Sequence, residues 1–261
     1  MNFTRTLIAA ALIASGSAAF AQAAITQNMA VAGGVTPGDT AGFPVTLSQP
    51  GSYKLTSNLF VPEGSIGVHI TAANVTLDLN GFSIIGPSTC TRVSNTKAVT
   101  CAYTGSFAGV AVAYNAAGAM VRGGTVKGFQ SGVSSYASAS VEDITATFNM
   151  QGVTFSVSAG TSFRLSGINA SYNSGNGIDT GSAIGTIERS QSNHNGGIGI
   201  NAKQNSVTLF NVQAIENFGH GIDGGSGHAV NATGNGTGAN AAQNFYLFRS
   251  MGNNLNGTTQ F

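Results

Sequence analysis

Short runs of alternating apolar and polar residues, separated by glycine and asparagine, fill most of this 261-residue chain. Four of these runs resemble one another, and each ends in an asparagine followed three or four residues later by glycine and then valine or isoleucine. They occupy residues 144–149, 168–173, 190–195 and 212–217, with the terminal asparagines 24, 22 and 22 residues apart. Alternation with a period of two predicts β-strands, and a repeat of this length predicts one small unit stacked on copies of itself.

The glycine that precedes valine or isoleucine marks the same point of each repeat. It recurs at Gly67, Gly109, Gly132, Gly152, Gly177, Gly199 and Gly221. No helical period of useful length separates these marks, so helices are not expected between the repeats. We therefore predict an all-β fold, a single-domain right-handed parallel β-helix that is a solenoid of about eight coils.

The domain boundaries follow from where this pattern begins and loosens. Residues 46–261 are predicted to form the β-helix, after a loose lead-in at residues 24–45 that has no clear period. Because the strand edges of a solenoid's end coils need covering, residues 46–65 are expected to form an N-terminal cap. Residues 239–261 are expected to form a last coil or a C-terminal cap.

Two positions of the repeat are expected to be structural. The apolar residue after each glycine should point into the core and form one stacked column, which contains Val153, Ile178, Ile200 and Ile222. The asparagines that end the runs should stack at a corner, where their amides can hydrogen-bond along the ladder. These are Asn149, Asn173, Asn195 and Asn217.

The first 23 residues have the features of a secretory signal peptide. Arg5 supplies the positive start, residues 7–13 are apolar, and Ala21-Gln22-Ala23 is typical of a cleavage site. No later run approaches the roughly 18 apolar residues of a transmembrane helix. We therefore expect an exported protein, either secreted or located in the periplasm or cell envelope.

The net charge of the chain limits the classes of partner that it can bind. Without Arg5, the ten basic and nine acidic residues of the whole chain become nine and nine, a net charge of zero. Nucleic acid is excluded as a partner because binding its phosphates requires an excess of basic residues. The same balance disfavours an electrostatic attachment to anionic lipid, and we expect a monomer.

One interval between glycine marks, from Gly67 to Gly109, spans 42 residues and exceeds one coil by about 20. The excess, residues 87–106, contains both cysteines of the chain, Cys90 and Cys101. In an exported protein, two cysteines this close predict a disulfide that closes an inserted loop. A metal site is not expected there, because two cysteines without a nearby histidine do not supply four ligands.

The segment before and within the first coil resembles a known group of proteins. It reads Pro50-Gly-Ser-Tyr-Lys-Leu-Thr-Ser-Asn-Leu59, then Val61-Pro62, then Asn74-Val-Thr-Leu-Asp-Leu-Asn-Gly-Phe-Ser-Ile-Ile-Gly-Pro87. Together with the two-cysteine insertion and the glycine-isoleucine repeats, this resembles short exported bacterial right-handed parallel β-helix repeat proteins with a pectin lyase-like fold. The resemblance covers roughly residues 46–225 and implies the fold and export. The wider fold class contains pectate lyases, polygalacturonases, uronan epimerases and non-catalytic adhesins, so it does not imply one activity.

The first candidate functional residues each follow a residue of the core column by one position. There Asp179, Asn201 and Asp223 should point outward on successive strands, which would place the two carboxylates about 9 to 10 Å apart. Lys203 follows Asn201 by two residues and should share its face. We predict Asp179, Lys203 and Asp223 as catalytic residues, and Asn201 and His220 as binding residues.

Two enzymatic interpretations fit these residues. In an inverting glycosidase, the two aspartates would act as acid and base around a water, at the upper edge of the roughly 6.5 to 9.5 Å separation that such pairs have. In a lyase or epimerase acting on an acidic polysaccharide, Lys203 would remove the proton beside a uronate carboxylate. The acids, with or without Ca²⁺, would then hold that carboxylate.

A non-enzymatic interpretation competes with both. Polar residues on an outer face commonly do no more than keep a surface in contact with water, so the β-helix can equally be a surface or matrix scaffold, or an adhesin. His220 lies in a Gly-His-Gly segment that resembles a polygalacturonase motif, but Asn176 and Ile198 stand where those enzymes have aspartates. His220 can therefore also be a corner residue.

The inserted loop is the only obvious wall for a cleft. It is attached about four coils from Asn201, which is roughly 19 Å at the spacing of β-strands. We therefore expect that the loop does not reach the acidic residues, and that they form an open strip that holds a polysaccharide weakly.

Overall fold

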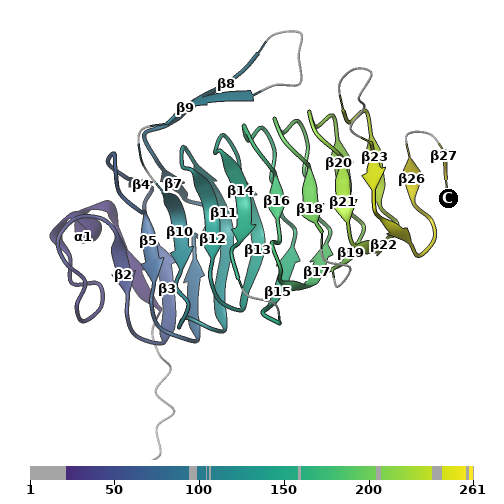
Figure 1. The fold of residues 1–261 in the computed structure, drawn as a ribbon. Coiled ribbons are helices and arrows are strands. Elements are labelled where there is room, and N and C mark those ends of the chain that lie inside the picture. Colours follow the sequence, from purple (N-terminus) through teal and green to yellow (C-terminus); the bar gives the residue numbers. More distant parts are fainter. Residues whose placement is uncertain are drawn as a thin grey trace, which may run out of the picture.

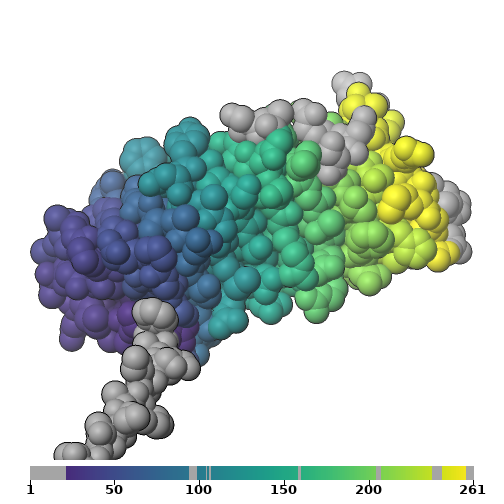
Figure 2. Space-filling view, turned by 90° about the horizontal axis from the view of Figure 1, so that it is seen from below, coloured from purple at the N-terminus to yellow at the C-terminus, as the bar shows by residue number. Residues whose placement is uncertain are grey.

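Parallel β-strands wind about eight times around one long core in the computed structural model of this chain (Figure 1). The structure describes residues 22–93, 99–103, 105, 107–157, 160–203, 207–236, 243–256 and 259–260. Successive turns follow one another along an elongated body (Figures 1 and 2). The predicted all-β parallel solenoid of about eight coils is confirmed. Most of the expected signal peptide, residues 1–21, lies outside the described residues.

Each turn contributes to three faces of the solenoid, of which face 1 positions the candidate site. Face 1 is a parallel sheet of one short strand per turn. In order it contains β2 (Val45–Leu47), β5 (Val68–Ile70), β10 (Ala108–Val112), β12 (Ser131–Ser135), β14 (Gln151–Phe155), β16 (Ile178–Asp179), β18 (Ile200–Ala202), β21 (Ile222–Gly224) and β24 (Phe245–Tyr246).

Faces 2 and 3 complete each turn. Face 2 contains β1 (Ala23–Ile25), β3 (Gly51–Leu55), β6 (Val75–Asp78), the first parts of β11 (Ala119–Lys127) and β13 (Ala139–Ala146), then β15 (Ser162–Ser166), β17 (Ile184–Glu188), β19 (Val207–Phe210), β22 (Ser226–His228) and β25 (Arg249–Ser250). Face 3 contains β4 (Leu59–Phe60), β7 (Ser83–Ile85), the second parts of β11 and β13, then β20 (Gln213–Ile215), β23 (Asn231–Thr233) and β26 (Leu255–Asn256). The last strand, β27 (Thr259–Gln260), pairs antiparallel with β26.

The inward side chains of face 1 form the predicted core column. The strand register places the four predicted residues opposite one another, and all are fully buried: Val153, Ile178, Ile200 and Ile222. The glycine before each of them is required by close packing between turns. A Cβ atom on Gly152, for example, would lie 2.4 Å from the carbonyl oxygen of Gly177 on the next turn. The recurring glycine therefore marks where adjacent turns touch through their backbones.

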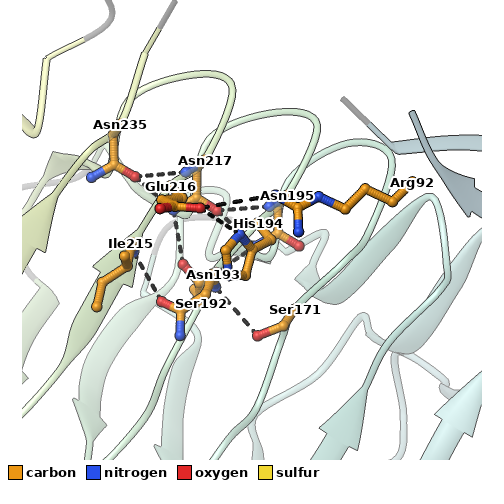
Figure 3. A network of polar contacts seen from close by, with 10 residues as sticks. All are labelled: Arg92, Ser171, Ser192, Asn193, His194, Asn195, Ile215, Glu216, Asn217 and Asn235. Carbon is orange, nitrogen blue, oxygen red and sulfur yellow. Dashed lines mark hydrogen bonds and ion pairs between the residues drawn. The ribbon is translucent and has the colours of Figure 1, made fainter. Parts of the chain in front are cut away.

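The predicted asparagine ladder runs along the corner between face 3 and face 1 (Figure 3). The backbone N–H of Asn173 donates to the side-chain oxygen of Asn195 at 2.9 Å, and the backbone N–H of Asn195 donates to that of Asn217 at 2.9 Å. Asn149 stands one turn before Asn173 and bonds to it in the same way, and all four are fully buried. The ladder continues to Asn235. The stacking and hydrogen bonding predicted for these asparagines are confirmed.

The N-terminal end differs from the expected lead-in and cap. Residues predicted to be a loose lead-in form β1, which pairs with β3, and a short helix, α1 (Gln27–Ala32). Thr26 begins this helix by accepting a hydrogen bond from the Met29 N–H at 3.1 Å, and Ala30 of the helix is part of the core. The residues expected to cap the stack instead form its first turn, because β2, β3 and β4 pair in parallel with β5, β6 and β7. Across the described ranges, no helix is long and apolar enough to cross a membrane.

The inserted residues form an antiparallel hairpin of β8 (Thr89–Arg92) and β9 (Val99–Ala102), joined by the predicted Cys90–Cys101 disulfide. The hairpin extends along the corner over later turns (Figure 1). The Cys90 sulfur lies 3.0 Å from the carbonyl oxygen of Phe148. At its far end, Arg92 lies 3.9 Å from Glu216, which also contacts His194 at 3.2 Å (Figure 3).

The inserted loop was expected not to reach the acidic residues of face 1, and this stays a prediction, because the described contacts of the hairpin lie along the corner. Paired strands are extended, at about 3.4 Å per residue, and these two run along the stack instead of folding back on their turn of origin. As a result the hairpin reaches the turn that contains Glu216.

Candidate functional site

The outward side chains of face 1 form a column in register, one residue beyond the core column. In order it contains His69, Ala111, Ser134, Thr154, Asp179, Asn201, Asp223 and Tyr246. Asp179, Asn201 and Asp223 thus occupy successive strands, as the repeat predicted. The three residues directly before Asp179 are small, so this part of the face is lower than its surroundings: Ala111, Ser134 and Thr154.

A groove of about 500 Å³ lies over this lower part of face 1. Its floor is formed by the outward residues Ala111, Ser134, Thr154 and Asp179. The edge where the strands begin is formed by Ile66, Phe107, Ala108, Gln130, Ser131 and Gln151. The edge where they end is formed by Tyr136, Phe155, Ser156, Val157, Gly181 and Ser182. A concavity of this size is in the range of ligand sites, so the groove is the candidate site.

Exposed aromatic rings stand at both edges of the groove. Phe107, at the starting edge, is 60% exposed, and Tyr136, at the opposite edge, is 37% exposed. The ring of Tyr136 packs against Tyr114 with their centroids 5.0 Å apart, and Tyr114 is 77% exposed. Half of the other lining residues carry hydroxyl or amide side chains, which both donate and accept hydrogen bonds.

The groove contains one carboxylate, Asp179, and no lysine, arginine or histidine among the described residues that line it. Asp179 Oδ2 accepts hydrogen bonds from the side-chain amides of Asn176 at 2.9 Å and Asn201 at 3.0 Å. Its Oδ1 accepts from the backbone N–H of Gly181 at 3.1 Å. Three donors therefore hold the carboxylate in one orientation at the end of the groove. Asn201 acts here through Asp179 and does not itself line the groove.

Asp223 does not share the exposed surface that the sequence predicted. It is only 4% exposed, and Tyr246 on β24 follows it in the column. Its Oδ1 atom and that of Asn201 are both buried without a hydrogen-bond partner in the described structure. The prediction of one exposed strip running from Asp179 to Asp223 is therefore wrong.

The two other predicted site residues also lie outside the groove lining. Lys203 follows the end of β18 and is exposed to solvent. The ring of His220 stacks on Tyr246 at 4.6 Å, and its Nδ1 accepts a hydrogen bond from the Gln243 N–H at 2.8 Å. His220 thus has the contacts of a corner residue, as the competing interpretation held.

Metal binding stays a prediction for this site. The described residues contain no group of three or more histidines, cysteines, aspartates or glutamates placed to hold an ion. Asp179 offers one carboxylate, and its oxygens already accept the three hydrogen bonds from Asn176, Asn201 and Gly181.

Titratable groups also flank the site. Burial lowers the pKa of His69, which precedes Ala111 in the outward column. Burial raises the pKa of Tyr103, at the base of the hairpin, and its 2.9 Å hydrogen bond to Ser174 opposes that shift. Both rings therefore stay neutral over a wider range of pH than in water.

The aromatic edges and the glutamines of the groove were not found from the sequence. The sequence prediction rested on the charged members of the outward column, whereas its small members leave the space of the groove. Ala111, Ser134 and Thr154 carry the signal that could have located the floor. Phe107 directly follows the inserted segment, and nothing in its sequence position indicates which way its ring turns.

Comparison of the chain with protein-family models, curated proteins and solved structures finds no match. The class of protein is therefore defined by the architecture itself. It is a parallel β-solenoid with a polar, aromatic-edged groove on one face and a disulfide-closed hairpin along one corner.

Proposed function

We propose that this chain is an exported glycan-binding protein that holds a neutral oligosaccharide in the groove on face 1. The observation that carries the proposal is the arrangement of the groove, in which the hydroxyl groups of Ser134 and Thr154 and the carboxylate of Asp179 lie on a floor between the exposed rings of Phe107 and Tyr136. A sugar ring presents both an apolar face and a rim of hydroxyl groups. Aromatic rings can pack against the first, and side chains that donate and accept hydrogen bonds can bind the second.

The charge of the groove supports a neutral ligand over the acidic polysaccharide that the sequence suggested. Asp179 is the one charged side chain among the described lining residues. A uronate carboxylate in the groove would approach this like charge without a nearby cation, and such a juxtaposition is unfavourable. A neutral sugar can instead donate a hydroxyl hydrogen bond to the same carboxylate without repulsion.

The positions of the other predicted catalytic residues support binding over turnover. An inverting glycosidase needs two carboxylates facing one substrate. Asp223 is buried and does not line the groove, so Asp179 lacks that partner there. A lyase or epimerase needs a base beside the sugar ring, and Lys203 is outside the lining. A rod with a binding groove is also what an adhesin-like surface or matrix protein requires.

Export is part of the proposal and has three supports. The first 23 residues have the pattern of a signal peptide. The structure contains a disulfide, which is typical of oxidising compartments. The first-coil motif resembles exported bacterial β-helix proteins of the pectin lyase-like type.

A glycan array followed by calorimetry tests the binding function. Wild type should bind one or more neutral oligosaccharides, and Tyr136→Ala should weaken that binding by at least about five-fold, since truncating a packed aromatic contact commonly costs more than 1 kcal/mol. Phe210→Ala is the matched control, because Phe210 is an exposed aromatic residue on face 2. Absence of binding to all neutral glycans, or an equal loss in the control, would overturn the proposal.

A further inference from the structure

A second, smaller cavity adjoins the groove at the base of the disulfide hairpin. This side pocket has a volume of about 250 Å³ and is lined by Tyr103, Gly105, Phe107, Gln130 and Met150. Phe107 and Gln130 also line the groove, so the two cavities meet at these side chains. A ligand lying in the groove therefore has direct access to the side pocket.

The chemistry of the side pocket differs from that of the groove. Two aromatic rings and the thioether of Met150 make its wall apolar. The one side-chain amide, that of Gln130, stands where the pocket meets the groove. Hydroxyl groups alone would make poor contact with such a wall, whereas a small apolar substituent would displace water from it.

From this juxtaposition we infer that the groove recognises N-acylated sugars, with the acyl group of one acetamido sugar seated in the side pocket. The acyl methyl group matches the wall formed by Tyr103, Phe107 and Met150. The Gln130 side chain carries both a donor and an acceptor and matches the amide N–H and carbonyl of the acetamido group. This assignment rests on the proposed glycan-binding function and specifies its ligand.

The hairpin builds the recognition element. Tyr103 follows β9 directly, and the hydroxyl group of Tyr103 forms a 2.9 Å hydrogen bond with Ser174 on the stack. The outer wall of the side pocket thus comes from the insertion, and Met150 and Gln130 come from the repeats. Solenoid turns alone would provide a groove, and the insertion adds selectivity for the substituent.

The charge at Asp179 makes a deacylated sugar an informative comparison. A free amino sugar is cationic and would be attracted to this carboxylate, but it has no acyl group for the side pocket. If electrostatic attraction controlled binding, the deacylated ligand would bind more tightly. If the side pocket controls binding, the acylated ligand binds more tightly than the deacylated one even though it carries no charge.

The test uses matched oligosaccharides that differ at one substituent. Isothermal titration calorimetry compares tetramers of N-acetylglucosamine, glucosamine and glucose, all β-1,4-linked, and galactose-type pairs that differ in the same way. Wild type should bind the acetylated member of a pair about ten-fold more tightly than the hydroxyl member, because one methyl group is buried and one amide is paired. Gln130→Ala should reduce this ratio to about three-fold or less, because the lost amide pairing weakens binding of the acetylated member more than that of the hydroxyl member.

Controls separate the inference from the function on which it rests. Gln130 is exposed, so its replacement should leave the melting temperature as in wild type. Met251→Ala, at an exposed methionine far along the chain, should leave the preference unchanged. Equal binding within each pair, or tighter binding of the amine, would overturn the acyl assignment and leave the glycan-binding groove standing. Absence of binding to every tetramer and to the neutral array would overturn both.

Discussion

Replacement of Asn195 by alanine tests the corner ladder that joins the turns. The side-chain oxygen of Asn195 accepts from the backbone N–H of Asn173 at 2.9 Å and from its side-chain amide at 3.1 Å. The side-chain NH₂ of Asn195 donates to the carbonyl of Ala170 at 2.9 Å and to Asn217 at 2.9 Å. In Asn195→Ala the buried N–H of Asn173 loses its acceptor. An unpaired buried donor costs about 1 to 3 kcal/mol, and the vacated space adds to that.

We therefore expect Asn195→Ala to lower the free energy of unfolding by about 3 to 5 kcal/mol. Urea unfolding followed by far-ultraviolet circular dichroism measures it, with a lower midpoint and an unchanged slope. Asn115→Ala is the matched control, because Asn115 is an exposed asparagine in a turn. This replacement should change the free energy of unfolding by no more than about 0.5 kcal/mol. A loss under about 1 kcal/mol in Asn195→Ala would refute the view that the amide ladder holds adjacent turns together.

Three further changes test other parts of the molecule. Ile200→Asp puts a charge into the fully buried column and should cost more than about 4 kcal/mol, so a soluble variant with an unchanged melting temperature would contradict the inward placement. Cys90→Ser opens the disulfide and should lower stability by roughly 2 to 3 kcal/mol while the solenoid stays folded, and two free thiols in unreduced, denatured wild type would contradict the bridge. Burial lowers the pKa of His69 in the folded protein below its value of about 6.5 in the unfolded chain. The neutral ring therefore contributes its full stabilisation above about pH 6.5, and this stabilisation is lost as the pH falls through the lowered pKa of the folded state. The melting temperature of wild type should accordingly fall more steeply below about pH 6.5 than that of His69→Gln. If the melting temperatures of the two proteins depend on pH in the same way, His69 is not the source of the pH dependence.

The fold could be predicted because its determinants are local and repeated. Alternation places one residue of each pair inward, and the glycine before Val153 or Ile200 lies against the backbone carbonyl of the equivalent glycine on the next turn. The asparagine ladder was predictable for the same reason, since each copy meets the next copy of itself. Cys90 and Cys101 could be paired because they are the two cysteines of one short insertion.

The site depends on features that do not repeat, and the sequence predicted less of it. Asp223 occupies the same repeat position as Asp179, yet Asp223 is buried, so the repeat position alone does not determine exposure. The hairpin contacts Glu216, more than a hundred residues later in the chain, and no periodicity encodes that contact. The ring of Phe107 lines the groove because of where the insertion rejoins the solenoid.

The hairpin also has a consequence for how the rod would respond to mechanical load. Its contacts with Phe148, Ser174 and Glu216 lie on successive turns of the corner, from just after β13 to just after β20. A force that pulls turns away from the C-terminal end breaks the strand hydrogen bonds, the asparagine ladder and the core contacts between one turn and the next. From Glu216 inward the hairpin adds contacts that bridge several turns at once, and the disulfide keeps its two strands from sliding past one another. Mechanical load on the turns beneath the hairpin is therefore shared over more of the chain than load on the turns beyond Glu216.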